Sequence, residues 1–135
     1  MSADGPVLVF DGVCVLCNRS VRFVLEQDRA RRFRFAVSAS ASGRELMIRH
    51  GIDPDAPASV LLVEDGRAFV ESAAVLRVLA SLGSGWRVVA ALLRCVPASL
   101  RDRGYRFVAQ RRYRWFGRHE ICPLPSPEDA GRFLP

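Results

Sequence analysis

The sequence that decides the fold is Val7-Leu8-Val9-Phe10-Asp11-Gly12-Val13-Cys14-Val15-Leu16-Cys17. Its first four residues are apolar and indicate a short buried strand, which Asp11 and Gly12 interrupt. From about Cys14 to Asp28 the apolar residues recur at helical spacing, which predicts an amphipathic helix. Because one helical turn separates the two cysteines, their sulfurs can bond to each other or share a metal.

A second strand and a second helix are expected next. Phe33–Val37 alternates with period two and is rich in aromatic residues, which is typical of a strand. Ser42 and Glu45 fit a capping box, so a short helix is predicted to begin there. Gly51 is predicted to end that helix.

A hairpin and a third helix complete the first 85 residues. Ser59–Val63 indicates a strand, and Asp65-Gly66 is the preferred pair for a two-residue hairpin turn. Ala68–Glu71 is then a fourth strand, antiparallel to the third. Ser72 is predicted to cap the helix that follows.

This order of elements, β-α-β-α-β-β-α, defines an α/β fold. The first two connections are long enough for parallel neighbours, whereas the hairpin requires an antiparallel pair. The expected fold is therefore a thioredoxin-like, mixed four-stranded sheet covered by helices, with the two cysteines at the end of its first strand.

Residues 86–135 form a basic, mainly helical C-terminal extension. The net charge is +6, and the arginines and acids of residues 1–85 balance, so the whole excess lies in this part. Trp86–Val96 and Leu100–Phe116 are predicted helices, and Tyr105, Val108 and Tyr113 belong to an apolar stripe expected to face the core. We expect the extension to pack on residues 1–85, so that residues 1–135 form a single domain.

The basic extension could contact an anionic membrane surface or an acidic protein. Nucleic-acid binding is not expected, because no recognised motif for it is present. No signal peptide and no apolar run of the ~20 residues needed for a membrane span is visible, which favours the cytoplasm. There, cysteines are usually reactive, metal-bound or buried thiols, and the apolar surroundings of Cys95 predict a core position.

The spacing of Cys14 and Cys17 suits dithiol–disulfide exchange. This reaction needs one thiolate to attack a disulfide and a second thiol to resolve the mixed disulfide. A helix N-terminus lowers the pKa of a thiol, so Cys14 is the expected exposed nucleophile and Cys17 the more buried resolving thiol. Asp11 is a candidate for moving a proton to or from the buried thiol, or else a turn residue, and Arg19 could add positive potential.

The segment from Phe10 to Asn18 resembles the DCC family of predicted thiol-disulfide oxidoreductases. That family is named for an Asp-x-x-Cys-x-x-Cys motif, which Asp11, Cys14 and Cys17 match. The similarity continues through Phe33–Ala36, Ser72–Leu76, Arg112–Gly117 and Cys122–Pro125. The resemblance implies a thioredoxin-like fold and exchange with protein or small-molecule thiols and disulfides, without a cofactor and with no defined substrate.

Two features depart from thioredoxin itself. Val15 and Leu16 separate the cysteines where thioredoxin has Gly-Pro. The cis-proline that precedes the third strand of thioredoxins is replaced by Ala58 and Ser59, with Pro57 one position early. Substrate docking by a cis-proline loop is therefore in question.

A zinc site is the alternative interpretation of the cysteine pair. His119 and Cys122, three residues apart, could join Cys14 and Cys17 as tetrahedral ligands of a structural or interaction module. Otherwise Cys122 is a small buried residue or a third thiol near the pair. The sequence makes no prediction about the oligomeric state.

Overall fold

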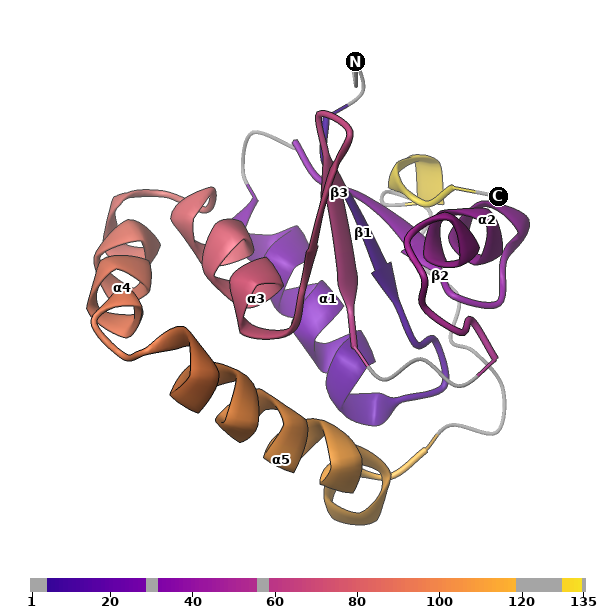
Figure 1. Ribbon diagram of the computed structural model, residues 1–135. Coiled ribbons are helices and arrows are strands. Elements are labelled where there is room, and N and C mark those ends of the chain that lie inside the picture. Colours follow the sequence, from indigo (N-terminus) through magenta and orange to yellow (C-terminus); the bar gives the residue numbers. More distant parts are fainter. Residues whose placement is uncertain (1–4, 29–31, 56–58, 119–129, 135) are drawn as a thin grey trace.

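The structure is a computed structural model that describes residues 5–28, 32–55, 59–118 and 130–134. Its centre is a four-stranded sheet in the order β2-β1-β3-β4 (Figure 1). The strands are β1 (Val7–Phe10), β2 (Arg34–Val37), β3 (Leu61–Glu64) and β4 (Arg67–Val70). This mixed sheet with its helices is a thioredoxin-like fold, as the order of elements predicts.

The strand directions correct one expectation. β1 and β2 are parallel, as the first connection allows, but β3 runs antiparallel to β1. The second connection therefore leads across the sheet to the far side of β1 and does not form a second parallel unit. β4 then pairs antiparallel with β3 through a turn in which Asp65 and Gly66 both have positive φ. This is the type I′ geometry that the Asp-Gly pair predicts.

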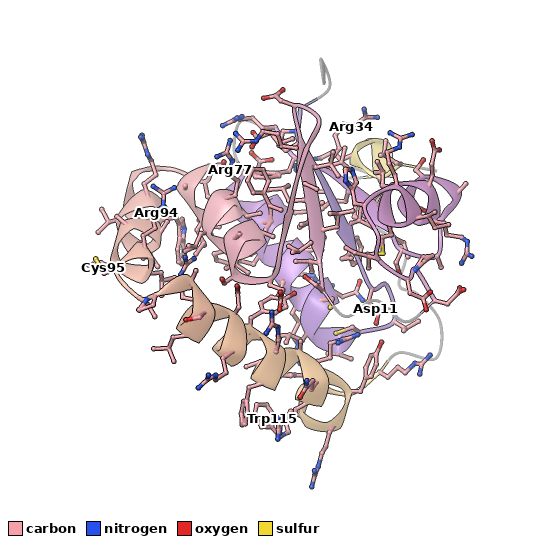
Figure 2. The ribbon with its side chains drawn as sticks, in the orientation of Figure 1. Asp11, Arg34, Arg77, Arg94, Cys95 and Trp115 are labelled. Carbon is pink, nitrogen blue, oxygen red and sulfur yellow. The ribbon has the colours of Figure 1, made fainter. Side chains whose placement is uncertain are left out.

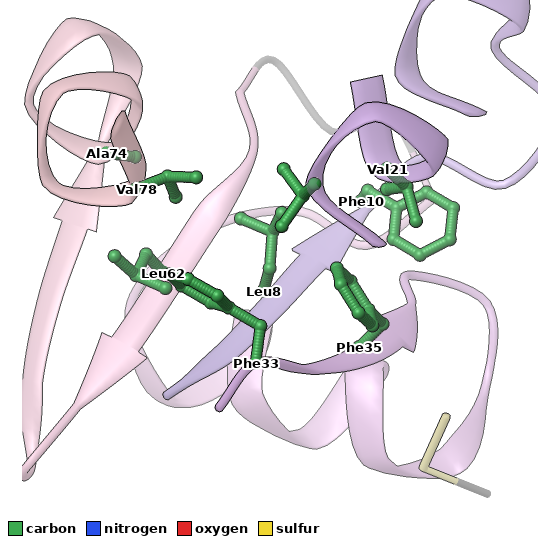
Figure 3. Close-up of a cluster of buried hydrophobic side chains, with 9 residues drawn as sticks. Leu8, Phe10, Val21, Phe33, Phe35, Leu62, Ala74 and Val78 are labelled. Atoms are coloured by element: carbon green, nitrogen blue, oxygen red, sulfur yellow. The ribbon is translucent and has the colours of Figure 1, made fainter. Parts of the chain in front are cut away.

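Helices cover both faces of the sheet. They are α1 (Val15–Gln27), α2 (Ala41–Arg49), α3 (Glu71–Ala80), α4 (Ser84–Arg94) and α5 (Ala98–Phe116), followed by a short 3₁₀ turn, Ala130–Arg132. Alternation along β1 sends Leu8 and Phe10 towards α1 and α3 and sends Val9 towards α2. Figure 3 shows the larger of the two clusters, in which Phe33, Phe35 and Leu62 pack with residues of α1 and α3.

Two helix caps differ from the sequence prediction. Ser40, not Ser42, caps α2, because its Oγ accepts a hydrogen bond of 3.1 Å from the Gly43 N–H. The helix begins early where it approaches β2 so closely that a Cβ at Gly43 would overlap the Val37 carbonyl oxygen. Ser72 does not cap α3 either: its hydroxyl and its N–H both donate to the carboxylate of Asp102 in α5.

The C-terminal helices are attached at a few points rather than buried. Trp86 of α4 packs edge-on against Phe23 of α1, with ring centroids 4.9 Å apart, and its indole N–H donates to Gln27. No residue of α5 is fully buried, and Tyr105 is only half-buried, so the prediction that the stripe along this helix belongs to the core is wrong. The core position predicted for Cys95 is also wrong, because this cysteine is exposed beyond the end of α4.

An ion pair fixes the end of the described chain to the sheet. Arg132 donates to the Asp28 carboxylate at 2.5 Å, and both side chains are buried. Asp28 also accepts from the Phe33 N–H at 2.8 Å. Within the described ranges, none of the helices has the length and apolar character to cross a membrane.

Candidate active site

Cys14 is the residue at which β1 gives way to α1. Its backbone is extended, and its Sγ accepts a hydrogen bond of 3.2 Å from the Cys17 N–H, so the sulfur itself is the N-cap of the helix. The Asp11 carboxylate accepts from the Val13 N–H, and Asn18 donates to the carbonyl oxygens of Gly12 and Cys14. These contacts hold the turn so that the sulfur faces the Cys17 N–H in the first turn of the helix.

The two thiols have opposite acidity. The hydrogen bond from the Cys17 thiol lowers the pKa of Cys14 to about 6, with support from the Cys17 N–H and the positive charge of Arg112 against the cost of burial. The same sulfur–sulfur hydrogen bond, together with burial, raises the pKa of Cys17. Near neutral pH the pair therefore holds a thiolate on Cys14 and a proton on Cys17.

The cation beside the cysteines comes from α5. Arg112 lies 3.4 Å from the Asp11 carboxylate, and the Tyr113 hydroxyl donates to the same carboxylate oxygen. Asp11 is 8% exposed, and in Figure 2 it lies where the start of α1 approaches the end of α5. Arg19, the cation suggested by the sequence, is exposed, whereas Arg112 is the cation that lowers the pKa of Cys14.

The sequence interpretation assigned no chemical role to Arg112 or Tyr113. Both residues lie far from the cysteines in the sequence. A periodic pattern describes only neighbouring residues, so it cannot place them at the site. One feature of the sequence could have indicated their role. The segment Arg112–Gly117 resembles the DCC family, although no pattern within the segment explains that similarity.

The expected exposure of the two cysteines is reversed. Cys14 is completely buried, because the segment after α5 lies across it: Arg118 forms an antiparallel bridge with Cys14, and the Val15 N–H donates to the Gly117 carbonyl at 3.3 Å. Gly117 has a φ of 95°, which favours glycine, and this lets the chain turn back over the start of α1. Cys17, by contrast, is a partly exposed residue.

Cys17 lines an apolar pocket of about 840 Å³ between α1, α3 and α5. Asp11 and Arg112 also line it, together with Phe23 and Val75 on the walls formed by α1 and α3. The face that α5 turns to the pocket carries Leu100, Gly104, Tyr105, Val108, Ala109 and Arg112. The size and the mainly apolar lining with a few polar groups are typical of a site for a small molecule or a side chain.

Tyr105 connects the pocket to the sheet. Its hydroxyl accepts a hydrogen bond of 3.1 Å from the Val60 N–H just before β3, and burial raises its pKa. Pro57 and Ala58, near the position of the thioredoxin cis-proline, lie outside the described part of the chain, as do His119 and Cys122 of the suggested zinc site. Among the residues that are described, no group of three His, Cys, Asp or Glu side chains is arranged to hold a metal.

A Cys-x-x-Cys pair at the start of the first helix of a thioredoxin-like fold is typical of thiol redox proteins. Comparison with known families agrees: the model of the DCC1-like thiol-disulfide oxidoreductase family matches residues 8–118. The chain belongs to this family.

Two curated proteins illustrate the relationship. The chain is 40% identical over 129 residues to "Uncharacterized protein YuxK" of Bacillus subtilis, covering 96% of this chain and 93% of that protein. It is 41% identical over 119 residues to "DCC family protein At1g52590, chloroplastic" of Arabidopsis thaliana, covering 88% of this chain and 69% of that protein. No solved structure shows a significant match.

Replacing Arg112 with Met is expected to raise the pKa of Cys14 above its value of about 6, because the thiolate loses a nearby positive charge. The thiolate absorbance of the folded protein, followed as a function of pH, measures this directly. Arg111→Met is the matched control, because Arg111 is the neighbouring cation and lies over Phe107, away from the cysteines. An unchanged pKa in Arg112→Met, or an equal shift in both variants, would contradict the assignment.

Proposed function

We propose that this protein is a thiol–disulfide oxidoreductase in which Cys14 is the nucleophile and Cys17 the resolving thiol. The observation that carries the proposal is the Cys14 sulfur at the N-terminus of α1, where its pKa falls to about 6. A thiol with this pKa is mostly thiolate at neutral pH and is still basic enough to attack a disulfide.

The exchange proceeds in two balanced steps. In the first, the Cys14 thiolate attacks one sulfur of a substrate disulfide, the substrate S–S bond breaks, and the departing thiolate takes up a proton. In the second, the Cys17 thiol loses its proton and attacks the Cys14 sulfur, which forms the Cys14–Cys17 disulfide and releases the other substrate sulfur as a thiol. Two electrons pass from the protein to the substrate, and the reverse sequence oxidises a substrate dithiol.

Asp11 is the proposed acceptor of the Cys17 proton. Cys17 needs a base because its pKa is raised, and the Asp11 carboxylate lines the same pocket and interacts electrostatically with both thiols. The hydrogen bond from Tyr113 and the ion pair with Arg112 hold the carboxylate in place. In this account Arg112 and Tyr113 are positioning residues.

A substrate disulfide can reach Cys14 only after the segment Gly117–Arg118 moves aside. The backbone contacts of this segment with the start of α1 are the bridge at Cys14 and the single hydrogen bond to Val15, so its displacement breaks few interactions. We propose that a substrate displaces this segment and forms backbone contacts in its place, much as a peptide adds to a strand.

The apolar pocket is the proposed site for the group next to the substrate sulfur. It begins at Cys17, Asp11 and Arg112 and continues along α5 between apolar walls. Proteins or small molecules with an apolar group beside the disulfide therefore suit it best. We further propose that residues 1–135 act as a single domain in the cytoplasm, where a reduced dithiol can be maintained.

Cys17→Ser is expected to accumulate a mixed disulfide on Cys14, because the second step is then blocked. The measurement is intact-protein mass spectrometry after incubation with an aromatic disulfide, combined with a turnover assay in which activity falls by about a hundredfold or more. Cys95→Ser is the matched control, since Cys95 is an exposed thiol outside the site and its loss leaves turnover unchanged. Adducts that collect on Cys95 and not on Cys14 would disprove the assigned nucleophile.

Asp11→Asn is expected to slow the second step by about a hundredfold, which is typical for the loss of a general base, and to leave the mixed disulfide with a longer lifetime. Rapid-quench mass spectrometry separates the two steps. The readout that a purely structural role would not reproduce is the pH profile: resolution in the variant should depend on added hydroxide or buffer base. If the second step keeps its rate and pH profile, Asp11 is only a turn residue.

Gly104→Leu is expected to fill the pocket and to reduce reaction with a bulky aromatic disulfide by about tenfold or more, while a small alkyl disulfide is affected much less. A Cβ at Gly104 meets no atom within 4 Å, so the helix accommodates the change. Gly104→Ala is the control, because it adds a side chain too short to fill the pocket. Equal loss of activity with both disulfides would show that the substrate does not enter this pocket.

A further inference from the structure

Helices α4 and α5 carry most of the exposed apolar side chains among the described residues. Thirteen large hydrophobic residues are exposed, and ten of them belong to these two helices. The ten are Val88, Val89, Leu92, Leu93, Leu100, Phe107, Val108, Tyr113, Trp115 and Phe116. Leu93, Leu100 and Val108 border the pocket described above and Tyr113 donates to Asp11, which leaves six for the outer surface: Val88, Val89, Leu92, Phe107, Trp115 and Phe116. Such a concentration on a water-exposed surface marks an interaction site.

The apolar groups on α4 lie along one side of the helix. Val88 is 60% exposed and Leu92 is 65% exposed, and the spacing of four residues places them on the same face. Ala90, by contrast, is buried on the side of α4 that faces the protein. In Figure 2, Cys95 and Arg94 lie at the outer end of α4, away from the sheet. Helix α4 therefore packs Trp86 and Ala90 against the protein and leaves Val88 and Leu92 in contact with water.

α5 adds aromatic side chains and cations to the same surface. Trp115 is 52% exposed, and its ring packs against Phe107 at 5.6 Å, while the Arg111 guanidinium lies 4.0 Å above the Phe107 ring. Arg103 and Arg106 line a hollow along α5 together with Arg111 and Phe107. Figure 2 shows Trp115 projecting from α5 on the side opposite the sheet.

The charge of this surface is strongly positive. Between Trp86 and Arg118 the sequence has nine arginines and one acid, Asp102, whose carboxylate accepts hydrogen bonds from Ser72. Arg106 pairs with Glu71 and Arg112 with Asp11. The other seven arginines form no ion pair with a carboxylate among the residues that the structure describes. An anionic partner is therefore complementary to the surface.

We propose that the outer faces of α4 and α5 form a peripheral binding surface for anionic lipid bilayers. Valine, leucine and tryptophan side chains enter the boundary between head groups and acyl chains, and the flanking arginines reach the lipid phosphates. Exposed aliphatic side chains gain little from contact with nucleic-acid phosphates, which argues against that partner. A second copy of the chain would bring two positively charged faces together, which argues against self-association.

The experiment is co-sedimentation of the full chain with vesicles of phosphatidylcholine, with and without phosphatidylglycerol. We expect binding to the anionic vesicles, a decrease with added salt, and little binding to phosphatidylcholine alone. Two double variants, Val88→Ser with Leu92→Ser and Arg94→Glu with Arg114→Glu, should each reduce the partition coefficient by about tenfold or more.

The matched controls are Ile48→Ser and Arg49→Glu, which change an exposed apolar residue and an exposed cation on α2. Both should bind vesicles like the unmodified protein. Circular dichroism and the thiolate titration of Cys14 establish that each variant is folded, so the outcome does not depend on the redox activity.

Several results would overturn the proposal. They are failure to bind anionic vesicles, binding that the α4 and α5 variants leave unchanged, and equal loss in the α2 controls. Binding to duplex DNA or polyglutamate in place of vesicles would assign the surface to another partner. Light scattering that shows a dimer, dissociated by Val88→Ser with Leu92→Ser, would assign it to a second copy.

Discussion

The contact between Asp11 and the end of α5 is the interaction on which the site depends. Arg112 and Tyr113 both bind the Asp11 carboxylate and so hold α5 against the start of α1. This contact brings a cation to the cysteines, makes α5 a wall of the pocket and leads Gly117 and Arg118 across Cys14. No residue of α5 is fully buried, and polar contacts at its two ends fix its position. Asp102 binds Ser72 near the start of α5, and Arg112 and Tyr113 bind Asp11 near its end.

The acidity of Cys14 follows from several opposing effects around one sulfur. Hydrogen bonds from Cys17 and the charge of Arg112 lower the pKa of Cys14. Burial and the negative charge of Asp11 raise it, but by a smaller amount. Asp11 therefore has two effects: its own charge opposes the thiolate, but it also retains the arginine that favours it. The Gly117–Arg118 segment that covers Cys14 is the segment that we propose a substrate displaces.

The strands, the hairpin and the cysteine pair could be predicted because each is encoded by neighbouring residues. Alternation in β1, the Asp65-Gly66 turn and the helical repeat after Cys14 are all short-range patterns. The direction of β3 and the caps of α2 and α3 depend on contacts between distant segments, and Asp102 replaces the cap that Ser72 suggests. The burial of Cys14 and the role of Arg112 depend on a contact about a hundred residues away in sequence. The apolar stripe of α5 suggested a core because periodicity cannot distinguish a core face from a pocket wall.

The proposed reactive chemistry lies in the sulfurs of Cys14 and Cys17 at the first turn of α1, where the Cys17 N–H donates to the Cys14 sulfur. The most direct measurement is to equilibrate the protein in glutathione buffers of increasing oxidising strength, alkylate the remaining thiols and identify the disulfides by mass spectrometry. The account predicts one reversible disulfide between Cys14 and Cys17, with Cys95 alkylated throughout. A pair that stays reduced in every buffer, or that joins other cysteines instead, would contradict it.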